Sequence, residues 1–475
     1  MSSTAAGMVH EVARNQMASA SGFRMGGTLF RTAPRGPAMA AMALSLAALA
    51  GCSTVERVGN VLGGGSSAPA GQPGHVRGFL GNVVAEDPRA AQIARDILSA
   101  GGSAADAAAA AGFTLAVTLP SRAGLGGGGA CLAYDPRRNE LESFLFQPGA
   151  RTGIPAGADR PAAVPMMARG LFTLHARQGR LPFEQILAPA EQLARVGTPV
   201  SRALAADFAA VSGPLLADPV SRAVFAPGGA PIGEGTSLTQ LELASTLAAL
   251  RSTGVGDFHQ GGLARRVEEA SAAAGGFLTV AEMRAAVPQA APPVQERLGS
   301  DLISVLPASA DGGATLAAFR AAASGQPAPV VGGSFGASTA LVVQDRDGGA
   351  VACAFTMNNL FGTGRMVSGM GFLLAPAPGL GSVQAPPLGA ILVTSPGAKA
   401  MRYAGAGSGQ GAAPAAAGGP AGLHFGRRVP LAQAVATGAP EPGRGVAISC
   451  QGGISASSCT AAADPRGFGL ATGNN

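Results

Sequence analysis

The chain has 475 residues, of which 47% are hydrophobic, 13% charged and 4% aromatic, and it contains no Trp. This length exceeds what one hydrophobic core usually supports, so we expect two lobes or one large layered domain. The formal net charge is +6, but the Arg residues are scattered and form no basic run with interleaved aromatics, which argues against a nucleic-acid-binding protein.

The amino-terminal region has the features of an export signal. Arg31 and Arg35 precede the apolar run "AMAAMALSLAALA", which is too short to span a bilayer but fits the core of a signal peptide. The run leads into Leu-Ala-Gly-Cys at residues 49–52, which resembles a bacterial lipobox. We therefore expect residues 1–52 to be a lipoprotein signal peptide and Cys52 to be lipidated. The protein would then be exported and anchored to a bacterial membrane, facing the periplasm. The alternative is a cytosolic apolar helix that ends in Cys by chance.

Residues 53–78 are rich in Gly, Ser and Pro and show little apolar periodicity, which predicts a flexible tether between membrane and folded region. Cys450 and Cys459 flank a short Gly- and Ser-rich segment, so a disulfide between them is one arrangement that the sequence leaves open. Cys131 and Cys353 lie in apolar runs, and we interpret them as buried small hydrophobic residues.

The first predicted elements are a strand followed by two helices. The strand covers residues 79–86, and Asp87 then predicts the start of a helix with Pro88 in its first turn. Gly101-Gly102 ends this helix, and Ser103 caps a second one that is apolar nearly all round and should be buried.

Four consecutive glycines at 126–129 precede a strand and not a helix, so they fit a phosphate-binding loop poorly. They predict close backbone approach or an unusual turn. Residues 165–285 have a helical pattern, and short strands dominate after residue 301, which together predict a layered α+β fold. The histidines show no metal-ligand spacing, so no metal site is predicted; they are His10, His75, His175, His259 and His424.

From about residue 79 to its end, the chain resembles the gamma-glutamyltransferases (glutathione hydrolases), which are N-terminal nucleophile hydrolases. Three blocks carry the resemblance: "VVAEDPRAAQIARDILSAGGSAADAAAAAGFTLAVTLPSRAGLGGGGACLAYD", "ARGLFTLHARQGRLPFEQILAPAEQLARVGTPVS" and "DPRGFGLATG". It implies a four-layer αββα sandwich without a cofactor. It also implies a large-subunit-like region, 79–337, and a shortened small-subunit-like region, 338–475.

Family chemistry depends on self-cleavage. The precursor is cut before a Thr, whose hydroxyl oxygen then attacks a gamma-glutamyl amide while its new α-amine acts as base, a role that a Ser can also fill. The family motif Thr-Thr-His precedes a hairpin that is recognisable here as "LVVQDRDGGAVACAFTMNN". Counting back from its Asp-Gly turn assigns Ser338 as nucleophile, with Thr339 next and Ala340 in place of the His. Thr356 and Asn358 match the polar positions of the return strand, and their spacing predicts that both face the same side.

Other family positions are altered. Gln147 stands where an Arg holds the substrate carboxylate, and Arg151, four residues on, is the other substrate-binding candidate. Residues 375–380, "APAPGL", replace the segment whose acid binds the substrate amino group, and Gly389-Ala390 replaces a Ser-Ser pair. In "GSGQG", the resemblance assigns Gly411 a backbone N–H at the oxyanion site.

Two hypotheses follow. In the first, the chain cleaves itself at Ala337–Ser338 and acts as an amide hydrolase or acyltransferase on a small-molecule amide, gamma-glutamyl or related, with altered substrate recognition. In the second, Ser338 and Thr339 merely begin a strand. The protein is then an inactive family member that serves as a lipid-anchored periplasmic binding or scaffolding protein.

Overall fold

The computed structural model describes residues 68–151, 153, 156–331, 337–380 and 382–473. The predicted signal peptide, Cys52 and most of the predicted tether lie outside the described residues. The described residues belong to one compact unit. None of their helices is both long and apolar enough to cross a membrane.

The end of the predicted tether packs on the folded region. The backbone N–H of Gly71 donates to the carbonyl of Ala100 at 3.0 Å, and that of Val76 donates to the carbonyl of Ser99 at 2.8 Å. Packed structure therefore begins before residue 79.

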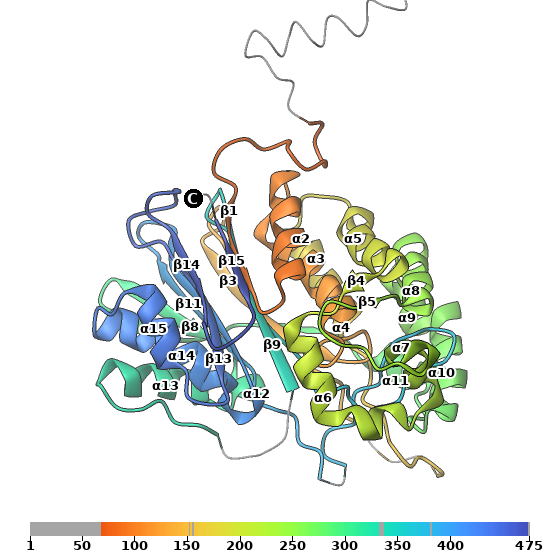
Figure 1. Ribbon diagram of the computed structural model, residues 1–475. Coiled ribbons are helices and arrows are strands. Elements are labelled where there is room, and N and C mark those ends of the chain that lie inside the picture. Colours follow the sequence, from red (N-terminus) through yellow and green to blue (C-terminus); the bar gives the residue numbers. More distant parts are fainter. Residues whose placement is uncertain (1–67, 152, 154–155, 332–336, 381, 474–475) are drawn as a thin grey trace, which may run out of the picture. The chain divides into compact units, whose positions relative to one another are not determined.

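Two antiparallel sheets form the centre of the molecule (Figure 1). The seven-stranded sheet has the order β15-β1-β9-β10-β2-β3-β6, and the six-stranded sheet has the order β14-β13-β12-β11-β8-β7. The strands of the first sheet are β1 (Gly81–Ala85), β2 (Gly128–Asp135), β3 (Glu140–Phe146), β6 (Gln289–Ala291), β9 (Ala337–Asp345), β10 (Ala350–Asn358) and β15 (Leu470–Thr472). Those of the second are β7 (Val294–Leu298), β8 (Asp301–Val305), β11 (Gly389–Ser395), β12 (Ala400–Ser408), β13 (Arg444–Ser449) and β14 (Thr460–Ala463).

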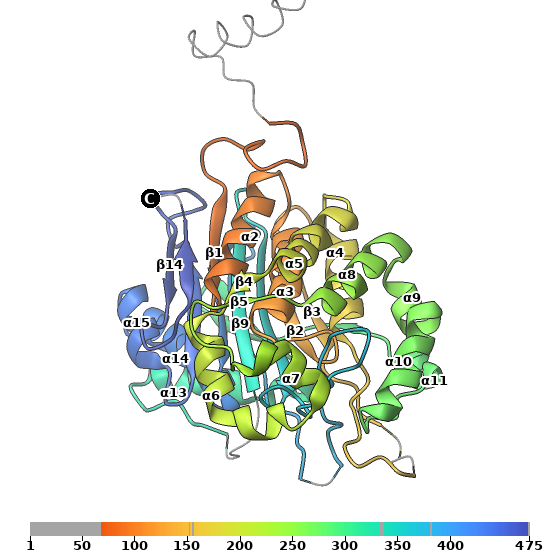
Figure 2. The ribbon, with the colours of Figure 1, turned by 45° about the vertical axis from the view of Figure 1, so that its right-hand side comes forward.

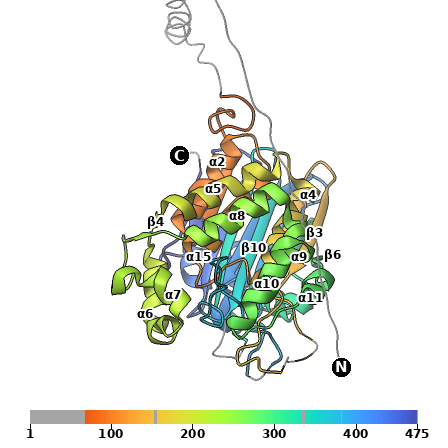
Figure 3. The same ribbon diagram turned by 90° about the vertical axis from the view of Figure 1, so that its right-hand side faces the viewer.

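Helices cover the outer face of each sheet. On the seven-stranded sheet, α2 (Pro88–Ser99), α3 (Ala104–Thr118), α4 (Met167–Gln178) and α5 (Phe183–Val196) form the covering layer, with the other helices of the first half around them (Figures 1 and 3). Those others are α6 (Arg202–Leu216), α7 (Pro219–Phe225), α8 (Leu241–Thr253), α9 (Val255–Gln260), α10 (Gly262–Ala273) and α11 (Val280–Ala285). On the six-stranded sheet lie α13 (Ala314–Ala323), α14 (Ala413–Gly426) and α15 (Leu431–Gly438) (Figure 2).

Short elements complete the chain. They are the ribbon of β4 (Thr198–Pro199) and β5 (Ser237–Leu238), the helix α12 (Ala308–Asp311), and the 3-10 turns η1 (Pro227–Gly229) and η2 (Gln410–Ala412).

Three buried layers hold this arrangement together. Leu341 and Val343 of β9 face the α2–α5 layer, whereas Val342 between them faces the six-stranded sheet. On the far side of that sheet, Ile391 packs with Phe319 of α13. Because both faces of β9 are covered, all nine of its residues are buried, including the polar residues near its two ends. The predicted four-layer αββα sandwich is confirmed.

Local sequence signals explain how the first helices begin. Asp87 accepts hydrogen bonds from two backbone N–H groups at the start of α2. Ser103 and Asp106 form a reciprocal capping box at the start of α3, every residue of which is buried. These predictions are confirmed.

The consecutive glycines serve close backbone approach, as predicted. A Cβ on Gly128 would lie 2.1 Å from the carbonyl oxygen of Phe146, and one on Gly126 would lie 2.1 Å from that of Leu373. The strand pairing around β2 therefore requires residues without side chains.

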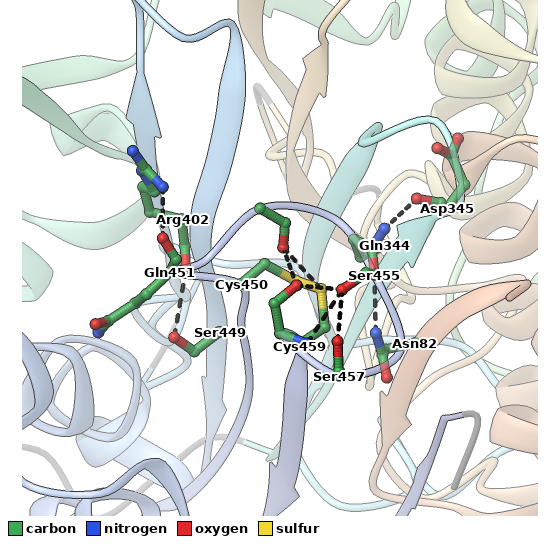
Figure 4. The surroundings of a disulfide bond; sticks show 12 residues. Asn82, Gln344, Asp345, Arg402, Ser449, Cys450, Gln451, Ser455, Ser457 and Cys459 are labelled. Carbon is green, nitrogen blue, oxygen red and sulfur yellow. Dashed lines mark hydrogen bonds between the residues drawn. A yellow bond between two sulfur atoms is a disulfide. The ribbon is translucent and has the colours of Figure 1, made fainter.

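The interpretation of Cys131 and Cys353 as buried small hydrophobic residues was correct about burial but missed their pairing. Both are fully buried, but they are direct partners on the adjacent strands β2 and β10 and form a disulfide. Their separation of 222 residues gave no sequence signal, because only the strand register brings them together. Cys450 and Cys459 also form a disulfide, which closes the Ser-rich loop between β13 and β14 (Figure 4).

Candidate active site

The predicted hairpin lies in the middle of the seven-stranded sheet, where β9 pairs with β10. Ser338 faces Thr356 in the register, near the amino-terminal end of β9. A bulge follows, so that Asn358 pairs with Ala337 and has a left-handed backbone with φ of 61°. The simple alternation that we inferred from the two-residue spacing therefore does not continue to Asn358.

Ser338 is almost completely buried, with 1% of its surface exposed. Its Oγ accepts a hydrogen bond from the backbone N–H of Gly409 at 3.0 Å. The hydroxyl of Thr356 donates to the carbonyl oxygen of Ala337 at 2.6 Å and accepts the backbone N–H of Asn358 at 2.8 Å. The peptide bond ahead of Ser338 thus has its carbonyl oxygen held by a hydroxyl donor.

The backbone donor at Ser338 is Gly409, two residues from the predicted Gly411. Gly409 follows β12 with a positive φ of 97°, and a Cβ there would lie 2.6 Å from the carbonyl oxygen of Pro442. Gly411 is buried in the turn η2, and its carbonyl oxygen accepts the N–H of Val331 at 3.3 Å. The backbone N–H that contacts the Ser338 hydroxyl is therefore that of Gly409, and the role of the Gly411 N–H at an oxyanion site stays a prediction.

A cavity of about 360 Å³ opens beside Ser338. It lies between the ends of β1, β9 and β12 and is closed by α6 and the carboxyl-terminal segments. Its lining residues are Glu86, Arg122, Ala203, Asp207, Ala337, Ser338, Leu360, Gly409, Gln410, Pro442, Arg444, Arg466, Gly467 and Phe468.

The predicted substrate-binding residues are not among those lining residues. The Gln147 amide donates to the carbonyl of Ser309 at 3.3 Å. The Arg151 side chain is 1% exposed and pairs with Glu282 at 2.8 Å. It also donates to two backbone carbonyls that precede α11. The Arg151 guanidinium is therefore occupied by the ion pair with Glu282, and Arg151 does not line the cavity.

The predicted catalytic residues divide into two groups. Ser338 lines the cavity, and Thr356 and Asn358 are buried beside it and linked to each other. The Asn358 amide also donates to the carbonyl of Pro376 at 2.9 Å. Thr339 is fully buried, does not line the cavity, and its hydroxyl has no hydrogen-bond partner among the described residues.

Charged residues of the cavity wall were missed by sequence reasoning. Arg122 donates to both carboxylate oxygens of Asp207, each at 2.7 Å, and its remaining terminal nitrogen lies 3.7 Å from Glu86. Arg122 lies between α3 and the glycine run at 126–129, and this position offered a weak signal. Asp207 comes 85 residues later in α6, and no spacing rule connects the two.

Glu86 is the most unusual of these groups. It follows β1, is 7% exposed, and accepts a hydrogen bond from the hydroxyl of Ser408 at the end of β12. Its second oxygen has no hydrogen-bond partner among the described residues. Burial raises the pKa of the Glu86 carboxyl, and the Arg122 guanidinium and the nearby hydroxyls of Ser408 and Thr339 only partly oppose this effect.

The remaining cations of the wall are already paired. Arg466 contacts Asp464 at 2.6 Å and Glu441 at 3.0 Å, and Arg444 contacts Glu441 at 2.9 Å. These ion pairs join the segment after β14 to the loop before β13. The described residues contain no cluster of three or more metal ligands. The arrangement offers a buried hydroxyl next to a polarised peptide carbonyl, which suits nucleophilic attack by oxygen.

Replacing Thr356 with Val should destabilise the fold. The variant keeps the shape but leaves the Ala337 carbonyl and the Asn358 N–H unpaired in a buried site, which costs about 1–3 kcal/mol. The measurement is urea unfolding without reductant, on a Ser338→Ala background that keeps the backbone uniform. The matched control is Thr437→Val on α15, whose hydroxyl is exposed and should matter by less than about 0.5 kcal/mol. Equal costs for the two variants would contradict the proposed importance of Thr356.

Comparison with known proteins gives a consistent picture. The family model described as Gamma-glutamyltranspeptidase matches residues 90–324. The chain is 35% identical over 209 residues to glutathione hydrolase 7 from Homo sapiens, covering 42% of this chain and 31% of that protein. It is 30% identical over 254 residues to the glutathione hydrolase proenzyme from Escherichia coli, covering 50% of this chain and 44% of the relative. The chain thus matches less than half the length of either relative.

Among solved structures, the cephalosporin acylase from Bacillus halodurans is similar over 84% of this chain and 96% of its own. The TM-score is 0.66 and the sequence identity 19%. At this identity the likeness concerns the fold, and it extends to the strands after residue 324 that the family model leaves unmatched.

Proposed function

We propose that the chain, which matches the Gamma-glutamyltranspeptidase family model through residues 90–324, is a member of that family and a self-processing amide hydrolase or acyltransferase. Ser338 is the nucleophile. The observation that carries the proposal is the geometry of the Ala337–Ser338 peptide bond. The Ala337 carbonyl accepts a hydrogen bond from the Thr356 hydroxyl, and the Ser338 hydroxyl accepts one from the backbone N–H of Gly409. The name of the Escherichia coli relative, a proenzyme, is in keeping with processing.

The proposed maturation proceeds in two steps. The Ser338 oxygen attacks the carbonyl carbon of Ala337, its proton passes to the Ser338 nitrogen, and the C–N bond breaks to leave an ester. Water then cleaves the ester, giving a carboxyl group on Ala337 and a free α-amine on Ser338. In the mature protein this amine takes the hydroxyl proton while Ser338 attacks a substrate amide, and water or an acceptor amine releases the acyl group.

The substrate that we propose is a small amide whose acyl group carries less charge than gamma-glutamyl. Arg151 is tied to Glu282, and Gln147 is neutral and outside the cavity. A gamma-glutamyl head would therefore lose charge-assisted hydrogen bonds worth about 1.5–3 kcal/mol each. Residues 375–380 supply no acid in their place.

The second candidate is an inactive, lipid-anchored binding or scaffolding protein. Its supporting observation is that most charged groups of the cavity are paired with one another, as Arg122 is with Asp207. The two candidates differ in the fate of the Ala337–Ser338 bond.

Replacing Ser338 with Ala should abolish scission. The wild-type chain should give two fragments on a denaturing gel, with the smaller beginning at Ser338 by amino-terminal sequencing. The gel must contain reductant, because the Cys131–Cys353 disulfide joins residues on opposite sides of the cut. Ser457→Ala, an exposed serine of the loop between β13 and β14, is the matched control and should cleave normally. A wild-type chain that stays whole under reduction would favour the inactive protein.

Substrate preference should follow charge. Cleaved protein should release the chromophore from a glutaryl anilide, which lacks the α-amino group, faster than from the gamma-glutamyl anilide. Loss of one charge-assisted hydrogen bond predicts a difference of about tenfold or more in kcat/KM. A faster reaction with gamma-glutamyl anilide would overturn the proposed change in recognition.

We propose that the protein is exported and anchored to the membrane through lipid on Cys52. The support is the sequence around Leu49–Cys52 together with two disulfides, which are typical of proteins in oxidising compartments. Cys52→Ser should move the protein from the membrane pellet to the soluble fraction. Sedimentation of the Cys52→Ser variant with membranes would contradict the anchor.

A further inference from the structure

Self-scission would create a new charge in a nearly closed site. The α-amine freed on Ser338 is an ammonium over much of the physiological pH range, and the residue that bears it is 1% exposed. A buried charge is costly unless an opposite charge or hydrogen bonds compensate it. Some group at the cavity must therefore receive the ammonium.

The hydrogen bonds of β9 show which side this nitrogen faces. In an antiparallel strand, successive residues direct their backbone N–H and C=O groups to opposite neighbours. The N–H of Asp345 points to the β10 side, where it bonds to Gly349, and the carbonyl of Ala340 points to the β1 side, where it accepts the N–H of Glu86. Ser338 lies two residues from Ala340, so its backbone groups point to the same side of the strand, and its nitrogen faces the β1 side.

At this point β1 has already ended. Its last residue is Ala85, and Glu86 is its continuation. Ser338 lies two residues beyond Ala340 along β9, which is about 7 Å. Glu86 therefore stands beside the flank of β9 to which the nitrogen of Ser338 points, and both residues line the same cavity.

The free oxygen of Glu86 is suited to receive a donor. One oxygen accepts a hydrogen bond from Ser408, while the other is buried, has no hydrogen-bond partner among the described residues, and lies 3.7 Å from the nearest nitrogen of Arg122. The other acid of the lining, Asp207, has both oxygens occupied by Arg122, and Ser121 donates to one of them as well. The further charged groups that surround the cavity are Arg444, Arg466, Glu441 and Asp464, which pair with one another.

We propose that Glu86 is the counter-ion of the α-amine that scission frees on Ser338. This inference rests on the proposed function. The oxygen that lacks a hydrogen bond accepts the ammonium in addition to its longer contact with Arg122, while the other oxygen keeps Ser408 in place and with it the neighbouring Gly409 N–H that binds the Ser338 hydroxyl. One carboxylate thus positions both the α-amine and the hydroxyl of Ser338. Because a neighbouring negative charge favours the ammonium form, Glu86 also raises the pH at which the amine becomes a base.

The test measures the protonation of this amine directly. Cleaved protein is labelled with acetic anhydride over a range of pH in competition with a reference amine, and mass spectrometry reads acetylation of the peptide that begins at Ser338. The pH dependence of acetylation gives the pKa of the Ser338 α-amine. In Glu86→Gln, which keeps the shape of the side chain but removes its charge, this pKa should fall by about one unit or more. Glu269→Gln, an exposed glutamate on α10, is the matched control and should leave it unchanged.

The outcomes separate the two proposals. A wild-type bond that stays intact overturns the proposed function and this inference with it. Normal scission with the same labelling pKa in wild type and Glu86→Gln overturns the inference alone and assigns the amine to another acceptor, such as the unpaired Asn358 oxygen. If Glu86→Gln blocks scission, the measurement is repeated on Glu86→Asp. Its shorter carboxylate lies farther from the amine, so the pKa of the Ser338 amine should fall by less than in Glu86→Gln. A pKa equal to that of the wild type would again overturn the inference.

Discussion

The antiparallel pairing of β9 with β10 is the constraint on which the rest of the site depends. It sets Ser338 opposite Thr356 in the middle of the seven-stranded sheet, where neither strand is exposed to water. It also directs the carbonyl of Ala337 to the Thr356 hydroxyl and, by alternation, the nitrogen of Ser338 toward Glu86. The second sheet adds one contact, the Gly409 N–H. A shift in this register would move Thr356 away from Ser338 and take the hydroxyl donor from the Ala337 carbonyl.

The fold was largely predictable because its signals are local. Asp87 and Ser103 mark helix starts, α3 is apolar all round, and the strands after residue 301 are short and apolar. What the sequence could not supply was contact between distant segments. Cys131 and Cys353 looked like ordinary core residues because nothing in their separation of 222 residues indicates the register of β2 and β10.

The site was predictable only along the hairpin. The Asp-Gly turn fixes the positions of Ser338, Thr356 and Asn358 by simple counting, whereas the charged wall is assembled from residues far apart in sequence. Glu86 and Asp207 carry no motif, and their proximity arises from the stacking of layers. The sequence likewise gave no sign that Arg151 pairs with Glu282, which comes 131 residues later, and that it does not line the cavity. Motif counting locates a candidate nucleophile, but it does not reveal the charges around it.

The most direct test of this account is the intact mass of the mature wild-type protein before and after reduction. The account predicts one species without reductant, heavier than the uncut mature chain by one water molecule, because the Cys131–Cys353 disulfide retains both fragments. Reduction should then separate two species, the smaller with the mass of residues 338–475. A single species with no added water, unchanged in number by reduction, would contradict the claim that Ser338 becomes an amino-terminal nucleophile.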